Sequence, residues 1–398
     1  MISVDEARTI IRNAVSFTEN ITVRIEDAEN MVLAESVIAN HAQPPFDASA
    51  MDGYACQSAD LSNPNTELSL IGISAAGKAY DGCLGAGETV RIFTGAPVPK
   101  GADCVVIQEN TERRDNTVIV KTTSTPGQNI RKTGVDFDKN DTLVPKNEIL
   151  TGRALIVAAA GNNATVTVRR RPKIALLANG DELVPVGGRR NKDQIICSIP
   201  YGLAPLIRHW GGCPVFCGIA RDDPDDIEAK VKAVDGADII VPIGGASVGD
   251  KDYMRSVFKT LGFTTLFEKV AVKPGKPTWF GKMKNSIVLG LPGNPASALV
   301  TSYLFLHPAI NALIGKSNDS TLPLLTARTK APISSNGDRE TYLRGSLSTD
   351  NSGNRVVLAS ERQDSSLTSV FALSNVLIRR EKNAIAVSIG EQVEILPL

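Results

Sequence analysis

The sequence predicts a multi-domain protein built around an α/β domain whose sheet is mostly parallel. The chain has 398 residues, more than one hydrophobic core usually supports, so three or four domains are expected. Strand-like and helix-like patterns alternate from Lys173 to about Gly315, which is typical of strands joined by crossover helices. On both sides of this region the apolar runs are short and broken by turn residues, which indicates β-rich modules.

The chain begins with a predicted helix and then changes to a β-rich pattern. Ser3 and Glu6 form an S-x-x-E capping box, and apolar residues follow at helical spacing. From about 41 to 146, short apolar runs alternate with Gly, Pro and Asn, which predicts a β-rich module. The Ala-rich segment 150–160, closed by Gly161, predicts a second helix.

The α/β region is predicted element by element. Asp223 is expected to cap a helix, because Pro224 fits the first helical position. The last part, from about 320 to 398, alternates like strands and predicts a small all-β domain. In chain order the predicted elements are strand 173–178, helix 199–209, strand 214–219, helix 224–234, strand 238–243, helix 252–261, strand 265–272, strand 286–290 and helix 295–314.

Composition and charge exclude several classes of partner. Lys plus Arg and Asp plus Glu both number 43, so no global field draws the chain to nucleic acid or to an anionic membrane. Three distant histidines and six scattered cysteines argue against a His-rich zinc site and fit reduced thiols in a cytosol. The N-terminus is acidic, and no apolar run approaches the roughly 20 residues of a membrane helix. We therefore expect a cytoplasmic protein that binds neither nucleic acid nor membrane.

A proline-rich loop is predicted to hold an anion. Leu291-Pro292-Gly293-Asn294-Pro295-Ala296 lies between an apolar strand and a long helix. The prolines fix the backbone and Gly293 allows close approach, so the N–H groups at the helix start can point at a phosphate-like group. The Lys273-Pro-Gly-Lys-Pro277 loop adds two ammonium groups, within a run of five lysines and no acid from 269 to 284. A solvated basic face is the alternative interpretation of that run.

Carboxylates are predicted at successive strand ends. Glu182, Asp222 and Asp252 each follow a predicted strand, and in an open α/β sheet ligands bind beyond these ends. Such oxygen ligands suit Mg²⁺, whereas helix capping is the structural alternative. Gly244 and Gly245 allow close backbone approach and Ser247 offers a hydroxyl to a phosphate or pterin-like edge. A tight turn without a ligand explains these three residues equally well.

Two segments of the β-rich module also carry more polar chemistry than a simple loop needs. Asp52 stands directly before Gly53, and Thr94 lies at a turn rich in Gly and Pro. Ordinary β-turn chemistry explains either one, because Asp-Gly is itself a hairpin signal.

Taken together, these motifs resemble the molybdopterin molybdenumtransferase family, the bacterial relatives of the C-terminal half of gephyrin. The resemblance runs in order from about residue 3 to residue 398. Each motif is weak alone, and seven in sequence are specific. They are Ser49–Ala55, Thr94–Pro99, Gln128–Arg131, Gly180–Glu182, Gly244–Gly249, Lys273–Pro277 and Leu291–Pro295.

The resemblance implies a subunit of four parts and a reaction. The parts are a helical and extended region (1–40 and 147–170), an inserted β-rich module (41–146), a three-layer α/β molybdopterin-binding domain (171–316) and a C-terminal β-barrel (317–398). Family members form elongated homodimers whose active site lies between two subunits. The implied reaction inserts molybdate into adenylylated molybdopterin with Mg²⁺ and releases AMP. The molybdopterin adenylyltransferase is a candidate further partner.

The resemblance also assigns residues. Glu182, Asp222 and Asp252 are expected to position metal or molybdate, and the lysines to hold the phosphates of the ligand. The implied catalytic residues are Asp52, Thr94, Arg131, Asp136, Glu182, Asp222, Asp252, Lys269 and Lys273. The implied substrate-binding residues are Gly244, Gly245, Ser247, Lys276, Pro292, Gly293, Asn294, Pro295, Arg344 and Ser365.

The chain departs from the family pattern at three places. Ala178-Asn179 stands where a hydroxyl residue usually precedes Gly-Asp-Glu, and Cys197-Ser198-Ile199 replaces a more polar triplet. The basic run before Asp136 is thinned. These departures keep a second hypothesis open, a divergent paralogue that binds or carries the cofactor without catalysis. A general nucleotide-binding protein is disfavoured, because neither G-x-x-x-x-G-K-[ST] nor G-x-G-x-x-G occurs.

Overall fold

The computed structural model describes residues 1–234, 236–245, 253–316 and 324–398. Within these residues the chain forms two compact units. The first, called the pocket unit below, comprises Met1–Ile21, Asn30–Val32 and Val168–Leu398, and the second, the insert unit, comprises Thr22–Glu29 and Leu33–Thr167. The finer division into four parts stays a prediction, because these two units are coarser.

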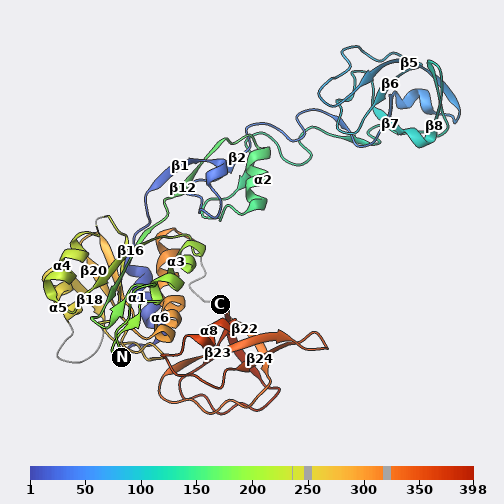
Figure 1. The fold of residues 1–398 in the computed structure, drawn as a ribbon. Coiled ribbons are helices and arrows are strands. Elements are labelled where there is room, and N and C mark those ends of the chain that lie inside the picture. Colours follow the sequence, from blue (N-terminus) through green and yellow to red (C-terminus); the bar gives the residue numbers. More distant parts are fainter. Residues whose placement is uncertain (235, 246–252, 317–323) are drawn as a thin grey trace. The chain divides into compact units, whose positions relative to one another are not determined.

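The pocket unit contains the predicted α/β sheet (Figure 1). Its six strands lie in the order β16-β13-β17-β21-β20-β18. The first four run parallel to their neighbours and the last two antiparallel, so the prediction of a mostly parallel sheet is confirmed. The strands are β13 (Lys173–Asn179), β16 (Cys213–Ala220), β17 (Ile239–Ile243), β18 (Phe263–Phe267), β20 (Trp279–Met283) and β21 (Ser286–Gly290).

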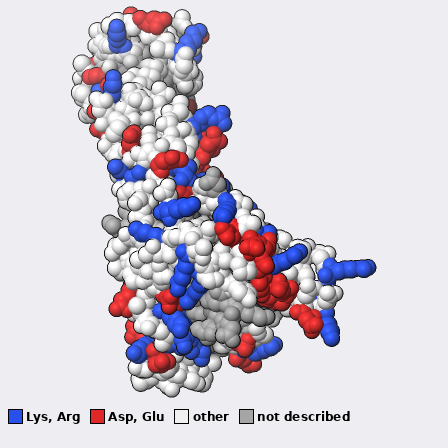
Figure 2. All heavy atoms as spheres, turned by 90° about the vertical axis from the view of Figure 1, so that its left-hand side faces the viewer, with Lys and Arg blue, Asp and Glu red and all other residues white. Residues whose placement is uncertain are grey.

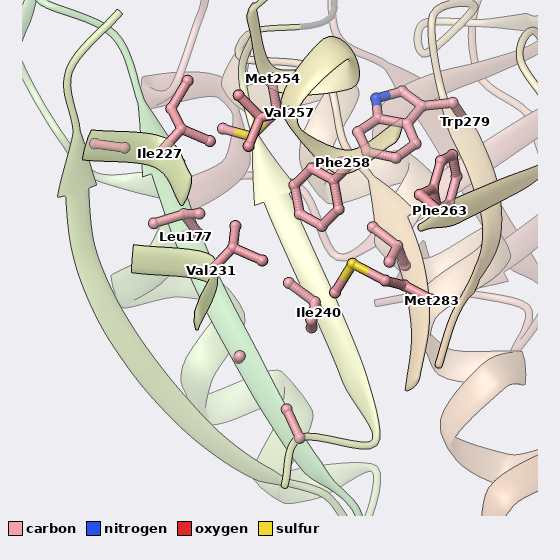
Figure 3. Packing of buried hydrophobic residues seen from close by; sticks show 14 residues of the cluster. Leu177, Ile227, Val231, Ile240, Met254, Val257, Phe258, Phe263, Trp279 and Met283 are labelled. Carbon is pink, nitrogen blue, oxygen red and sulfur yellow. The ribbon is translucent and has the colours of Figure 1, made fainter. Parts of the chain in front are cut away.

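Helices cover both faces of this sheet. Alternate residues of each central strand point to opposite faces, so Ala175 and Leu177 of β13 pack with Ile227 and Val231 of α4 (Figure 3). On the opposite face, α3 contacts both β13 and α6. The helices are α3 (Ile199–His209), α4 (Pro224–Lys232), α5 (Tyr253–Thr260), α6 (Pro295–Thr301) and α7 (His307–Leu313), with a π-helical turn, η4 (Ser302–Leu306), between the last two.

Local signals fixed several helix starts. The Ser3 hydroxyl accepts the Glu6 N–H at 3.1 Å and the Glu6 carboxylate accepts the Ser3 N–H at 2.7 Å, so the predicted capping box begins α1 (Val4–Ala14). Asp223 likewise caps α4. Thr151 caps α2 (Gly152–Ala160) in the insert unit.

The predicted strand 265–272 is wrong. The segment forms β18 and, after a break, the short β19 (Val272–Lys273), which pairs in parallel with a strand of the C-terminal barrel. Strand β20 was missed, because it is defined by its pairing with β18 and β21. A consequence is that Lys269 and Lys273 do not alternate on one strand face, since Lys269 lies between the two strands.

The C-terminal part is a small barrel, as expected. Its five strands close because β23 pairs with both β24 and β25. The core contains Val357, Val376, Ile378, Val393 and Ile395. The strands are β22 (Leu325–Thr329), β23 (Glu340–Thr349), β24 (Arg355–Ala359), β25 (Val376–Arg380) and β26 (Gln392–Pro397), and a short helix, α8 (Ser369–Ala372), precedes β25.

The insert unit is built on a second six-stranded sheet, in the order β7-β4-β6-β5-β9-β8. Its core includes Cys56, Leu61, Leu68, Cys104 and Val118. The strands are β4 (Gly53–Cys56), β5 (Thr66–Ser74), β6 (Glu88–Ile92), β7 (Cys104–Ile107), β8 (Thr111–Arg114) and β9 (Thr117–Val120).

Short elements complete the described chain. Four two-stranded ladders join β1 (Asn20–Arg24) to β12 (Thr165–Arg169), β2 (Val37–Ile38) to β11 (Thr142–Val144), β3 (Ala48–Ser49) to β10 (Ile130–Arg131), and β14 (Leu183–Val184) to β15 (Ile195–Ile196). Three 3-10 turns are η1 (Ile25–Asp27), η2 (Ser58–Leu61) and η3 (Gln108–Asn110).

One helix is long and apolar enough to cross a membrane, by length and composition alone. It is the continuous segment Pro295–Leu313, of which 72% is buried inside the protein. A core helix of a globular domain passes the same test. The prediction that no apolar run approaches this length is therefore wrong.

Candidate functional site

The pocket unit contains a cavity of about 500 Å³ at the carboxyl ends of β13 and β17 and beside the loop after β21. The chain passes from β13 outward to β16 and then returns to β17 on the other side of β13, so the cavity lies where the strand order reverses, the usual ligand position in such sheets. The lining residues are Ala178, Asn179, Glu182, Leu183, Ile195, Ile196, Cys197, Ser198, Ile199, Pro200, Ile243, Gly244, Gly245, Pro277, Pro292, Gly293, Asn294, Pro295 and Ser297.

Backbone conformation shapes the floor of this cavity. Gly244 has φ +94° and Gly245 has φ +65°, in the left-handed region that favours glycine. A Cβ on Gly244 would lie 2.7 Å from the Asn179 carbonyl oxygen. A Cβ on Gly245 would lie 2.7 Å from the side-chain Oδ1 of Asn179. The glycines therefore let the turn after β17 pack directly on the end of β13.

Acidic side chains stand at two strand ends. Glu182 is exposed and folds over Gly180, where a Cβ would meet its carboxylate at 2.2 Å. Asp222 and Asp181 tie the two loops together, because the Asp222 N–H donates to Asp181 at 3.2 Å. The Asp181 N–H approaches the Asp222 carboxylate at 3.5 Å. On the face drawn in Figure 2, acidic and basic side chains occur side by side.

The proline loop holds the start of α6, but one of its N–H groups is already used. Pro295 has no N–H, and the Ala296 N–H donates to the Ser365 carbonyl of the barrel loop at 3.0 Å. The Asn294 side chain donates to the Ser365 hydroxyl at 3.0 Å. The predicted anion site therefore has fewer N–H groups to offer than the sequence implied, because the Ser365 carbonyl already accepts the Ala296 N–H at the helix start.

Three exposed lysines flank this region. Lys273 lies in β19 opposite Thr341 of the barrel, and Lys276 precedes Pro277, which lines the cavity. The Lys269 carbonyl accepts the Ile2 N–H at 3.3 Å, while its side chain is exposed. All three ammonium groups are exposed, and Lys276 is the one that directly adjoins a cavity-lining residue in sequence.

In the insert unit, the structure brings Asp52 and Thr94 together. The Thr94 N–H and hydroxyl both donate to Asp52 Oδ1, at 2.7 and 2.8 Å. These two bonds hold the pKa of the Asp52 carboxyl below its ordinary value, so it is ionised at neutral pH. Arg131 and Asp136 are exposed in the same unit, on β10 and in the following loop, and within the described chain no hydrogen bond joins either side chain to Asp52 or Thr94.

Comparisons with known proteins agree with this geometry. Three family models match in order: the MoeA N-terminal region (domains I and II) over residues 2–161, a probable molybdopterin binding domain over 175–312, and the MoeA C-terminal region (domain IV) over 326–398. A molybdopterin molybdenumtransferase of Haemophilus influenzae is 35% identical over 400 residues, covering 100% of this chain and 98% of that protein.

The chain belongs to the molybdopterin molybdenumtransferase family. A second member, from Nostoc sp., is 36% identical over 359 residues and covers 87% of this chain and 82% of its own length. The crystal structure of a molybdopterin biosynthesis MoeA protein from Pyrococcus horikosii superposes with a TM-score of 0.86 at 29% identity, covering 100% of this chain and 99% of that one. The family fold predicted from the motifs is confirmed.

Two departures from the family pattern gain a structural explanation. Asn179 is 5% exposed, and its amide donates to the carbonyls of Ala220 and Arg221 at 3.3 and 3.0 Å. It therefore braces the ends of β13 and β16. Cys197 is 4% exposed, and burial raises the pKa of its thiol, so in this molybdenumtransferase-family chain it lines the cavity as a neutral thiol.

Arg344 is buried and holds a loop of the C-terminal barrel in place. It is 2% exposed, and its guanidinium donates to the carbonyls of Leu367 at 3.1 Å and Asp364 at 2.9 Å. It also lies over the Phe371 ring, 5.4 Å from the centroid. The family assignment of Arg344 as a substrate-binding residue is therefore not supported as a direct contact, because the side chain holds the loop that presents Ser365.

The predicted metal triad is placed only in part. Ser247 and Asp252 lie outside the described residues. Among the residues that are described, no three His, Cys, Asp or Glu side chains gather as metal ligands. Of the predicted triad, Glu182 and Asp222 stand at adjoining strand ends, and carboxylate oxygens are the ligands that Mg²⁺ prefers.

Part of the cavity wall was not predicted from the sequence. Ser297, 5% exposed, lines the cavity from the first turn of α6, and Ile195 and Ile196 line it from β15. The position of Ser297 two residues after the proline loop was a usable signal. The isoleucines gave none, because their role depends on how the 183–196 loop folds back.

Proposed function

We propose that this chain is a molybdopterin molybdenumtransferase, which inserts molybdate into adenylylated molybdopterin and releases AMP. The observation that carries the proposal is the cavity at the carboxyl ends of β13 and β17, in a chain similar to named molybdenumtransferases over its full length. Its volume of about 500 Å³ suits a small molecule.

The walls of the cavity fit a flat, phosphate-bearing ligand. Proline and isoleucine side chains give apolar surfaces for a ring, including Pro277 and Ile199. The exposed Lys273 and Lys276 would supply positive charge to the phosphates, because an ammonium 4 Å from a phosphate charge contributes about 4 kcal/mol at an effective dielectric near 20, before desolvation. Ser297 and Ser198 supply hydroxyls within the same wall.

Mg²⁺ is part of the proposal. Glu182 and Asp222 would hold it, together with Asp252, which lies outside the described residues, because the loops that carry Glu182 and Asp222 are joined at adjoining strand ends. When bound, the ion would neutralise charge on the phosphoanhydride that is cleaved. Asp181 and Asp222 hold the two loops together, because the backbone N–H of each residue points to the carboxylate of the other.

A homodimer with a shared site is also proposed. Asp52 and Thr94 form their cluster in the insert unit, while Glu182 and the lysines belong to the pocket unit. A family site assembled from two subunits would need both. A cytosolic location and contact with the molybdopterin adenylyltransferase complete the proposal, and the six free thiols support a reducing compartment.

The function is tested by supplying purified protein with adenylylated molybdopterin, molybdate and Mg²⁺ and measuring AMP and finished cofactor. AMP release that depends on molybdate supports the transferase. Tight binding of the substrate with no AMP would identify a carrier and overturn the transferase.

Mixing variants tests the shared site. We expect Asp52→Asn and Asp222→Asn each to lower turnover at least tenfold, because each removes one charge from a different unit. A mixture of the two variants should recover activity, since one combined site then has both acids. A mixture no more active than either variant alone would place both acids in one subunit's site.

A further inference from the structure

The insert unit carries an exposed aromatic ring that is backed by a fixed guanidinium. Phe93 is 39% exposed, and the Arg91 guanidinium carbon lies over its ring, 4.9 Å from the centroid. Arg91 also lies over Tyr54 at 5.1 Å. One face of Phe93 is thus covered by a cation, and its exposed surface is left to solvent.

Arg91 is held from several sides. It donates to the Gly53 carbonyl at 3.0 Å and to the Gln108 side chain at 2.7 Å. Both partners lie at the same end of the sheet, since β4 begins at Gly53 and β7 ends just before Gln108. Because Arg91 is anchored, the Phe93 ring has a fixed backing, which lowers the entropy cost of stacking a ligand on it.

A hydrogen-bond acceptor is bound to the residue that follows Phe93 in the chain. Phe93 and Thr94 begin a tight turn closed by the Ala96 N–H, which donates to the Phe93 carbonyl at 2.9 Å. Gly95 has φ +78°, as the third position of a type II turn requires. Both Thr94 donors end on Asp52 Oδ1, so Oδ2 is the oxygen whose lone pairs neither bond uses.

The exposed Phe93 ring and the ionised Asp52 carboxylate together favour one class of ligand. An ionised carboxylate repels phosphate and accepts N–H groups, and an exposed aromatic face stacks flat rings. We propose that Phe93 is the stacking surface for an amino-substituted nitrogen heterocycle whose N–H donates to Asp52. The inference rests on the proposed function, whose substrate carries two such rings, a pterin and an adenine.

The test measures binding by the full-length protein with two probes, 6-hydroxymethylpterin and AMP. Quenching of pterin fluorescence and calorimetry report the two affinities. We expect Phe93→Ala and Phe93→Leu to weaken at least one probe fivefold or more, and Phe93→Trp to restore it. The probe that weakens identifies which ring is held.

Phe17 provides a matched control. It is 61% exposed, and Arg169 lies over its ring at 4.7 Å, but it lies outside the insert unit. Phe17→Ala should leave both affinities unchanged. Wild-type affinity for both probes in Phe93→Leu, or equal losses in the Phe93→Ala and Phe17→Ala variants, would overturn the inference.

The outcome is separable from the proposed function. Wild-type protein that binds a probe through Phe93 yet releases no AMP supports the stacking surface and contradicts the transferase. Protein that releases AMP while the Phe93 variants keep both affinities supports the transferase and overturns the stacking surface.

Discussion

The cavity of the pocket unit and the Asp52–Thr94 cluster of the insert unit are built in opposite ways. The cavity is shaped by backbone, through glycines at positive φ, a proline loop and strand ends. The cluster joins two loops, since the Thr94 N–H and hydroxyl both donate to one carboxylate oxygen of Asp52, 42 residues earlier in the chain. The shape of the cavity therefore depends on the packing of the whole sheet, whereas the cluster depends on a few residues that can be substituted one at a time.

The largest expected effect comes from a methyl group in the cavity floor. Gly244→Ala places a Cβ 2.7 Å from the Asn179 carbonyl oxygen at φ +94°, so the β17 turn must move away from β13. We expect about 3 kcal/mol of destabilisation and loss of AMP release, measured by urea unfolding and by the AMP assay.

Gly262→Ala is the matched control. Gly262 has φ +90°, and no atom lies within 4 Å of the position that a Cβ would take there, so the variant carries the backbone strain without the clash. We expect a cost of about 1 kcal/mol and normal AMP release. Equal losses in both variants would show that backbone strain, and not the packing of the cavity floor, decides the effect.

Acid should weaken the pocket unit before the insert unit. Burial lowers the pKa of His307 from its ordinary value of 6.5 to about 4, with Lys316, His209 and Arg8 as the nearby positive groups. The unfolded chain therefore binds the extra proton first as pH falls. Stability is complete above about pH 6.5 and declines by about 3 kcal/mol down to pH 4.

The insert unit also has lowered pKa values, but they belong to carboxyl groups and act in a more acidic range. Hydrogen bonds from Lys132 and Thr133 lower the pKa of Asp47, and those from Thr94 lower that of Asp52. Their stabilisation is present above the ordinary carboxyl pKa of about 4 and is lost only below it. Hydrogen exchange resolved by segment at pH 7 and pH 5 should show opening in the pocket unit alone. His307→Phe, which keeps a ring stacked on Trp210, should flatten that difference, and unchanged acid opening would contradict the role of His307.

The smallest expected effect concerns the contact between the barrel loop and α6. Ser365→Ala removes the hydroxyl that accepts from Asn294 at 3.0 Å but keeps the carbonyl bond to Ala296. We expect about 0.5 kcal/mol of lost stability and a KM about threefold higher. Ser366→Ala is the control, because its hydroxyl donates to Asp364 at 2.6 Å and does not touch α6. A KM change shared by both variants would remove Ser365 from the site.

Much of the fold was predictable because its signals are local. The capping box at Ser3, the cap and proline at Asp223 and Pro224, and the alternation from β13 to β21 were all predicted and confirmed. Strand β20 was not, because its identity depends on pairing with β18 and β21.

The candidate site was predictable in part for the same reason. Gly244, Gly245 and the proline loop line the cavity as expected, because strand ends of a parallel sheet share one edge. Arg344 was assigned as a contact, and the structure buries it behind the Ser365 loop. An arginine in a sequence does not show whether its side chain binds a ligand or the backbone carbonyls of its own domain.

By itself the sequence determined the family and the order of helices and strands in the α/β region, apart from the segment that contains β18, β19 and β20. These follow from periodicity, caps and motif order, which act over a few residues. Only the tertiary structure decided that Ser365 occupies part of the α6 start, that Asn179 braces two strands, that Thr94 is bound to Asp52, and that Arg91 lies over the Phe93 ring. These outcomes depend on contacts between segments far apart in the chain, which no local pattern specifies.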